Sequence, residues 1–115
     1  MRIISYKIGR KVLIEQHLKF FPTLVKAAVD IVKGVMAIDA VLSQDLAQYL
    51  LKNGSLKENI WGVSLFPLKE KEGLIDYTST INVRPMQKNF DAEIKSSALR
   101  EKIKSIVDRL VDYES

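Results

Sequence analysis

The segment LIDYTSTINVR, Leu74 to Arg84, alternates between apolar and polar side chains and is followed by Pro85. Successive side chains of a β-strand point to opposite faces, so this period of two predicts a strand over residues 74–84. One face of that strand is largely apolar and the other is wholly polar, which is typical of antiparallel sheets. We therefore expect an antiparallel sheet in which the polar face of this strand ends at Arg84.

Other segments carry the remaining strand signals, which are apolar or alternating runs next to Gly or Pro: 2–7, 24–31, 35–39 and 60–66. Gly34 lies between the second and third of these runs and is free to take a positive φ, which predicts a tight β-hairpin turn. The charged residues 69–73 then form an exposed loop between the last two strands. Short connections of this kind favour antiparallel pairing.

Apolar residues recur at helical spacing in three segments: 10–21, 43–52, and from Ser96 or Ser97 to about 110. Ser43 is expected to cap the second helix and either of the two serines the third, because a side-chain oxygen can accept from the free N–H groups of the first turn. The order β-α-β-β-α-β-β-α predicts a two-layer α+β fold with three helices and an antiparallel sheet of four to five strands. Residues 1–115 are expected to form a single domain.

The composition excludes several classes of protein. The chain has 115 residues, 47% of them apolar, and no cysteine, so disulfides and thiolate metal sites are absent. No apolar run reaches the length of a membrane span, and no secretory signal is present, so we expect a cytoplasmic protein. None of the common nucleotide-binding or catalytic motifs occurs, and we expect no cofactor. The single histidine, His17, is interpreted as a surface or boundary residue with no catalytic role.

The net charge of +4 is concentrated near the N-terminus. Residues 1–26 contain only one acidic residue, Glu15, and a net charge of +5 results from their six basic residues: Arg2, Lys7, Arg10, Lys11, Lys19 and Lys26. Such a patch attracts phosphate backbones, but these residues are not interleaved with aromatics as in single-strand binders. Weak electrostatic binding of nucleic acid is therefore kept as a lesser alternative.

Several segments of the chain resemble an uncharacterised family of small bacterial proteins, catalogued as a domain of unknown function. The most distinctive are Trp61-Gly-Val-Ser-Leu-Phe-Pro67 and Ile81-Asn-Val-Arg-Pro85, the latter followed by Gln87 and Asn89. The similarity extends over nearly the whole chain. It implies no activity, because the family has none assigned.

The clearest candidate site comprises four polar residues at the end of the 74–84 strand: Asn82, Arg84, Gln87 and Asn89. A guanidinium flanked by amides is suited to a carboxylate or a phosphate, so these residues, with Asp30, predict an anion or ligand site. The alternative interpretation, which we favour, is structural. In that case Arg84 pairs with an acid on a neighbouring strand, Asp30 or Glu58, and the amides satisfy backbone groups of the loop.

Two classes of function remain open. The first is a non-enzymatic ligand-binding or protein-interaction module, self-associating through a sheet edge or an apolar helix face, with an anion site at Arg84. The second is a small hydrolase or nuclease acting on phosphate esters, in which Arg84 stabilises negative charge and Asp30, Asp76 or Glu58 acts as base or metal ligand. Expected partners are a second copy of the chain or a small anion, with no membrane.

Overall fold

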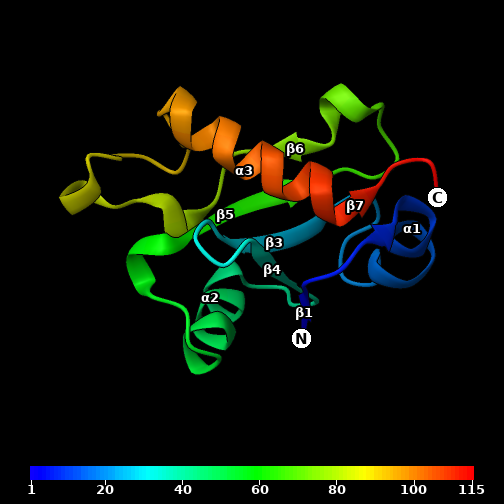
Figure 1. Ribbon diagram of the computed structural model, residues 1–115, viewed down its shortest axis with the longest axis horizontal. Coiled ribbons are helices and arrows are strands. Elements are labelled where there is room, and N and C mark those ends of the chain that lie inside the picture. Colours follow the sequence, from blue (N-terminus) through cyan, green and yellow to red (C-terminus); the bar gives the residue numbers. More distant parts are fainter.

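A computed structural model describes residues 1–115 (Figure 1). The strands are β1 (Arg2–Ile4), β2 (Ile8–Gly9), β3 (Val25–Asp30), β4 (Val35–Ile38), β5 (Ile60–Leu65), β6 (Ile75–Asp76) and β7 (Val111–Asp112). The helices are α1 (Arg10–His17), α2 (Ser43–Lys52) and α3 (Ser97–Leu110). Four short 3-10 helices complete the chain: η1 (Lys57–Asn59), η2 (Lys71–Gly73), η3 (Thr80–Asn82) and η4 (Pro85–Gln87).

Five strands form one antiparallel sheet in the order β1-β4-β3-β5-β6, and β2 and β7 form a separate parallel pair. In the centre of the sheet Val29 lies opposite Trp61, and Ala28 lies opposite Ala37. Gly34, with φ +69°, turns the chain between β3 and β4. The predicted α+β class, the antiparallel sheet and the three helices are therefore confirmed.

A helix lies on each face of the sheet, with α3 on one face and α2 on the other (Figure 1), where the sequence predicted two layers. The larger core, of 18 buried residues, packs one face against α3. The smaller core, of five buried residues, packs the other face against α2. Residues of β3 alternate between the two cores, because Val29 faces α3 and Ala28 faces α2. No helix is long and apolar enough to span a bilayer.

The predicted strand over 74–84 is wrong beyond its first residues. After β6 the chain leaves the sheet, and residues 80–82 and 85–87 form the two 3-10 helices η3 and η4. The reason lies in a side chain: the amide of Asn82 accepts from the backbone N–H of Gly62 at 2.8 Å and donates to its carbonyl at 2.9 Å. The Asn82 side chain thus forms the two hydrogen bonds to Gly62 that the backbone of a longer β6 would otherwise form at this edge of β5.

The chain can leave the sheet here because residue 62 is glycine. The Ser79 and Ile81 side chains occupy the space that a Cβ at position 62 would need. A Cβ at position 62 would come within 2.5 Å of Ser79 Cβ and 2.8 Å of Ile81 Cγ1. Such distances are closer than any van der Waals contact, so residues 79–81 would have to move away from β5.

We expect Gly62→Ala to lower the free energy of unfolding by about 1–3 kcal/mol, since it overpacks a close-packed contact. Urea unfolding followed by tryptophan fluorescence of Trp61 measures the change. Adding Ser79→Gly removes the nearest clashing side chain and should recover part of the loss. A fully stable Gly62→Ala protein would show that the segment does not lie on β5 as described.

The helix ends differ from the prediction in small ways. Helix α1 ends at His17 rather than Phe21, and α2 begins at Ser43, which is buried inside the first turn instead of capping it. The cap of α3 is confirmed, because Ser96 Oγ accepts from Leu99 N at 3.1 Å. His17 is not a surface residue: it is 5% exposed, and its Nδ1 lies 2.7 Å from Asp39 Oδ1.

Candidate functional site

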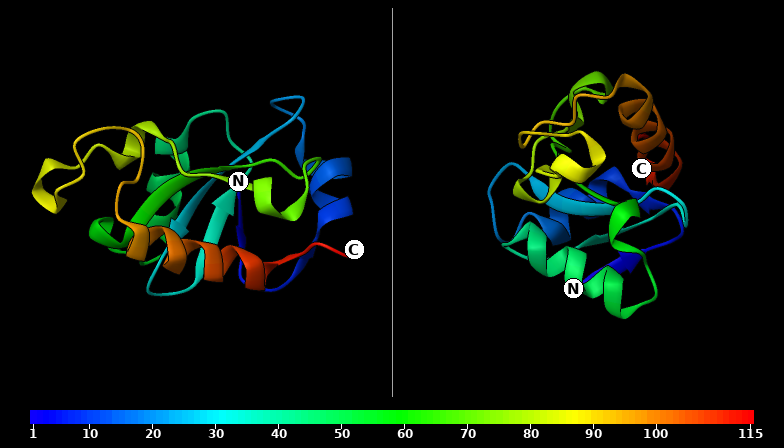
Figure 2. Two further views of the ribbon diagram at one scale, coloured as in Figure 1. Left: turned by 90° about the horizontal axis from the view of Figure 1, so that it is seen from above. Right: turned by 90° about the vertical axis from the view of Figure 1, so that its left-hand side faces the viewer.

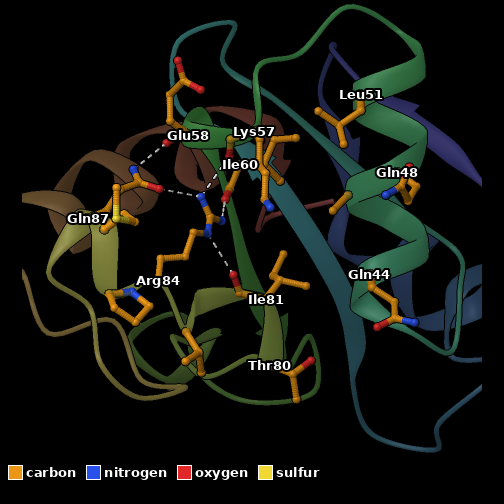
Figure 3. A pocket seen from close by; sticks show the side chains of 14 residues that line it. Gln44, Gln48, Leu51, Lys57, Glu58, Ile60, Thr80, Ile81, Arg84 and Gln87 are labelled. Carbon is orange, nitrogen blue, oxygen red and sulfur yellow. Dashed lines mark hydrogen bonds between the residues drawn. The ribbon is translucent and has the colours of Figure 1, made fainter.

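A pocket of about 740 Å³ opens between α2 and the segment that contains η3 and η4 (Figure 3). Its walls come from three places along the chain. Helix α2 contributes Gln44, Ala47, Gln48 and Leu51; the η1 and β5 region contributes Lys57, Glu58 and Ile60; and the loop contributes Thr80, Ile81, Val83, Arg84, Pro85, Met86 and Gln87. Apolar side chains, side-chain amides and two cations thus line the same pocket.

The α2 wall is a single stripe of the helix. Residues 44, 47, 48 and 51 are spaced by three and four positions, so they share one face. The apolar residues of this helix, Leu46, Ala47, Leu50 and Leu51, do not all have the same surroundings. Leu46 and Leu50 are indeed buried against the sheet, but Ala47 and Leu51 also line the pocket beside the two glutamines. One face of α2 therefore packs against the sheet, and the adjacent face lines the pocket.

Arg84 fastens the loop to the sheet through backbone carbonyls. Its Nε donates to Ile81 O at 3.0 Å, its Nη1 to Lys57 O at 2.9 Å, and its Nη2 to Ile60 O. Nη1 also donates to Gln87 Oε1 at 3.0 Å (Figure 3). Four of the five N–H groups of the guanidinium are thus engaged within the protein, and one on Nη2 remains.

The surroundings of Arg84 are aromatic and neutral rather than acidic. Its guanidinium carbon lies 4.3 Å from the centroid of the Trp61 ring. Trp61 belongs to the larger core. Burial lowers the pKa of Arg84 from its ordinary value, because desolvation disfavours the charged form. The predicted ion pair with Asp30 or Glu58 is wrong: no carboxylate lies within salt-bridge distance of Arg84.

The two asparagines lie inside the loop and away from the pocket. Asn82 is fully buried, and in addition to Gly62 it donates to Ala92 O at 3.2 Å. Asn89 is 5% exposed and donates to three carbonyls of its own loop, among them Asn82 O at 2.8 Å. Both amides satisfy loop backbone groups, as the structural interpretation predicted.

Of the predicted site residues, the structure brings only Arg84 and Gln87 to the pocket. Gln87 bridges the loop and η1, since its Nε2 donates to Glu58 O at 3.0 Å. Asp30 lies elsewhere, buried at the end of β3, where its Oδ1 accepts from Val32 N and Lys33 N in the hairpin turn. Asp30 is therefore a turn residue that does not line the pocket, although it lies opposite Ile60, which does.

The sequence interpretation missed Lys57 as a site residue. Figure 3 shows its side chain directed into the space between Arg84 and α2, whereas the carboxylate of its neighbour Glu58 points away from that space. Neither side chain is in an ion pair. Nothing in the local sequence marks Lys57, because its role depends on the loop that folds next to it.

The basic residues near the N-terminus are partly engaged within the chain. The guanidinium of Arg10 donates to Tyr113 O and Pro67 O and stacks on the Tyr113 ring at 4.5 Å. Lys19 pairs with Asp39 at 3.5 Å. The structure contains no group of three or more His, Asp or Glu side chains placed to hold a metal ion.

Fold and pocket together define a class: a small α+β fold in which an antiparallel sheet carries a helix on each face, with a mixed apolar and basic pocket beside α2. The chain belongs to the family described as "Protein of unknown function (DUF5674)", which matches over residues 2–110. The resemblance read from the sequence is thereby confirmed as family membership. No curated protein and no solved structure matches the chain.

Proposed function

We propose that residues 1–115 act as one small cytoplasmic binding domain, and that the pocket beside α2 binds a small organic anion with an apolar body. The observation that carries this proposal is the pairing of two cations, Lys57 and Arg84, with an apolar lining in a pocket of about 740 Å³. Ligand pockets of this kind are mostly apolar, measure roughly 300–1,000 Å³ and contain a few polar groups that orient the ligand.

The charge in the pocket favours an anion. Lys57 is directed into the pocket and has no acidic partner, so its charge is free to meet that of a ligand. Arg84 adds a fixed positive charge, although its occupied N–H groups leave no bidentate fork for a carboxylate. Lys57 therefore supplies the main contact with the anion, and Arg84 supplies one hydrogen bond.

The remaining lining selects the rest of the ligand. Ile60, Ile81 and Leu51 offer apolar contact, and Gln44 and Gln48 present amides that can donate or accept. This combination suits a carboxylate attached to a hydrocarbon better than a bare phosphate. The hydrolase alternative gains no support here, because Asp30 and Asp76 do not line the pocket and the Glu58 carboxylate is turned away.

Calorimetric titration with benzoate and hexanoate, each compared with its neutral amide and with inorganic phosphate, tests the proposal. We expect the carboxylates to bind more tightly than the amides, and Lys57→Met to weaken their binding about tenfold, the worth of one charge-assisted contact of roughly 1.4 kcal/mol. Lys52→Met is the matched control, since Lys52 is exposed on α2 and does not line the pocket.

Three results would contradict the proposal. One is the absence of binding by either carboxylate. A second is equal affinity for carboxylates and amides, which would remove the role of charge. The third is an equal loss of binding in Lys57→Met and Lys52→Met, which would reduce the effect to the net charge of the protein.

A further inference from the structure

The side-chain amides in the wall of the pocket differ in what they bond to. Three of the four glutamines of the chain line the pocket. Gln87 is engaged in both directions, because its Oε1 accepts from Arg84 Nη1 and its Nε2 donates to Glu58 O, each at 3.0 Å. Gln44 and Gln48 are exposed on α2, and neither side chain has a hydrogen-bond partner within the protein. Two complete amides therefore remain open to a ligand.

The cation and the free amides are arranged along the length of the pocket. Figure 3 shows Leu51, Gln48 and Gln44 in this order down α2, with Lys57 across the pocket toward the Leu51 end and Thr80 toward the Gln44 end. The order follows the chain, since η1, which carries Lys57, comes shortly after the C-terminal end of α2. One end of the pocket is therefore positively charged, and the wall that leads away from it carries neutral groups that both donate and accept.

The spacing of these two glutamines matches the repeat of an extended peptide. Gln44 and Gln48 are four positions apart on one helix face, which places them about 6 Å apart along the axis. An extended chain rises about 3.3 Å per residue, so peptide groups that point the same way recur roughly every 6.6 Å. Each glutamine offers a donor and an acceptor, the complements of a peptide C=O and N–H. A plain hydrocarbon chain offers neither amide a partner.

We propose that the pocket binds the carboxyl-terminal end of an extended peptide whose last side chain is aliphatic. The terminal carboxylate meets Lys57, the preceding peptide groups bond to Gln48 and then to Gln44, and the last side chain contacts Leu51 and Ile60. Charge complementarity selects a chain end, because an internal segment of a peptide carries no backbone charge for Lys57. The inference rests on the proposed function and narrows its organic anion to one chemical class.

Calorimetric titration with N-acetyl-glycyl-glycyl-leucine, its C-terminal amide and hexanoate tests this inference. We expect the peptide acid to bind at least about tenfold more tightly than hexanoate, because it adds hydrogen bonds to the two glutamines. The peptide amide should bind about tenfold more weakly than the peptide acid, since it has no charge to offer Lys57.

Substitution of the glutamines tests which groups hold the peptide. Gln48→Leu and Gln44→Leu remove one amide each from an exposed helix position, where leucine and glutamine have similar helix propensities. Each variant should lower the ratio of peptide affinity to hexanoate affinity by about three- to tenfold. Gln16→Leu is the matched control and should keep the wild-type ratio. Gln16 is exposed on α1, and Figure 2 shows α1, in blue, at the end of the molecule opposite the yellow loop beside the pocket.

The outcomes separate this inference from the proposed function. If hexanoate binds more tightly than hexanamide but the peptide acid binds no more tightly than hexanoate, the peptide is overturned and the organic anion stands. Equal binding of the peptide acid and its amide overturns the assignment of a chain end. An equal fall of the affinity ratio in Gln48→Leu and Gln16→Leu overturns the role of the α2 amides. If neither hexanoate nor the peptide acid binds, both proposals fail.

Discussion

Asn82→Ala is expected to lower the free energy of unfolding by about 3–5 kcal/mol, the largest effect of any single substitution in the loop. The substitution leaves two backbone groups without partners, Gly62 N–H and Gly62 C=O, and removes one of the two hydrogen bonds that Ala92 C=O accepts, the other coming from Ser79 N–H. The site is fully buried, so water cannot replace the lost bonds without opening the structure. Thermal unfolding should show a fall in Tm of about 10–20 °C.

Asn53→Ala is the matched control for that experiment. Asn53 is exposed and makes one side-chain hydrogen bond, to Tyr49 O at 2.8 Å, so we expect a loss within about 1 kcal/mol. Asn82→Asp provides a second test, because it keeps the acceptor for Gly62 N–H and loses the donor for both carbonyls. If Asn82→Ala were as stable as Asn53→Ala, the amide would not be holding the loop to β5.

The second large effect is expected at Arg84. Arg84→Met keeps an apolar stem near Trp61 but removes the donors to three carbonyls, those of Lys57, Ile60 and Ile81. We expect a loss of about 2–4 kcal/mol in the free energy of unfolding, measured by urea titration. Arg84→Lys should also destabilise, by less, because one ammonium cannot reach three carbonyls arranged around a planar guanidinium.

The same variants separate a structural role of Arg84 from that of a receptor. If Arg84 acted only in ligand binding, the Arg84→Met protein would lose carboxylate binding and keep its stability. If Arg84 holds the loop in place, Arg84→Met lowers the free energy of unfolding of the protein. Arg2→Met, at an exposed position, is the control for the removal of one positive charge. Unchanged unfolding of Arg84→Met, beside an unchanged Arg2→Met, would contradict the carbonyl contacts described above.

Local patterns predicted most of the regular structure correctly. Helix α2, the β3–β4 hairpin with its Gly34 turn, strand β5 and helix α3 with its Ser96 cap all follow from spacing and turn chemistry within a few residues. These elements bury one face against a neighbour, so their apolar periodicity reports directly on the fold. The α1 helix was predicted too long, because Phe20 and Phe21 continue its apolar composition beyond its last turn.

The alternation over residues 74–84 shows where such a pattern misleads. Its polar residues do not share one solvent-facing side of a strand: Asn82 turns inward to Gly62, and Arg84 turns to the carbonyls of η1 and β5. Asn82, Arg84 and Asn89 make most of their side-chain hydrogen bonds to backbone carbonyls of the loop, η1 and β5. Their common orientation, and with it most of the predicted receptor, was wrong.

By itself, the sequence determined that this is an α+β protein with an antiparallel sheet and three helices, because periodicity and turn residues act within a few positions of each other. The tertiary structure alone decided that Asn82 replaces a strand at the edge of β5, that Arg84 bonds to carbonyls and not to an acid, and that Lys57 faces a pocket. Each of these outcomes depends on backbone groups that lie 20 or more positions away along the chain. That information arises only when β5 and the loop pack together, since hydrogen bonding of buried groups is settled by position in space and not by order along the chain.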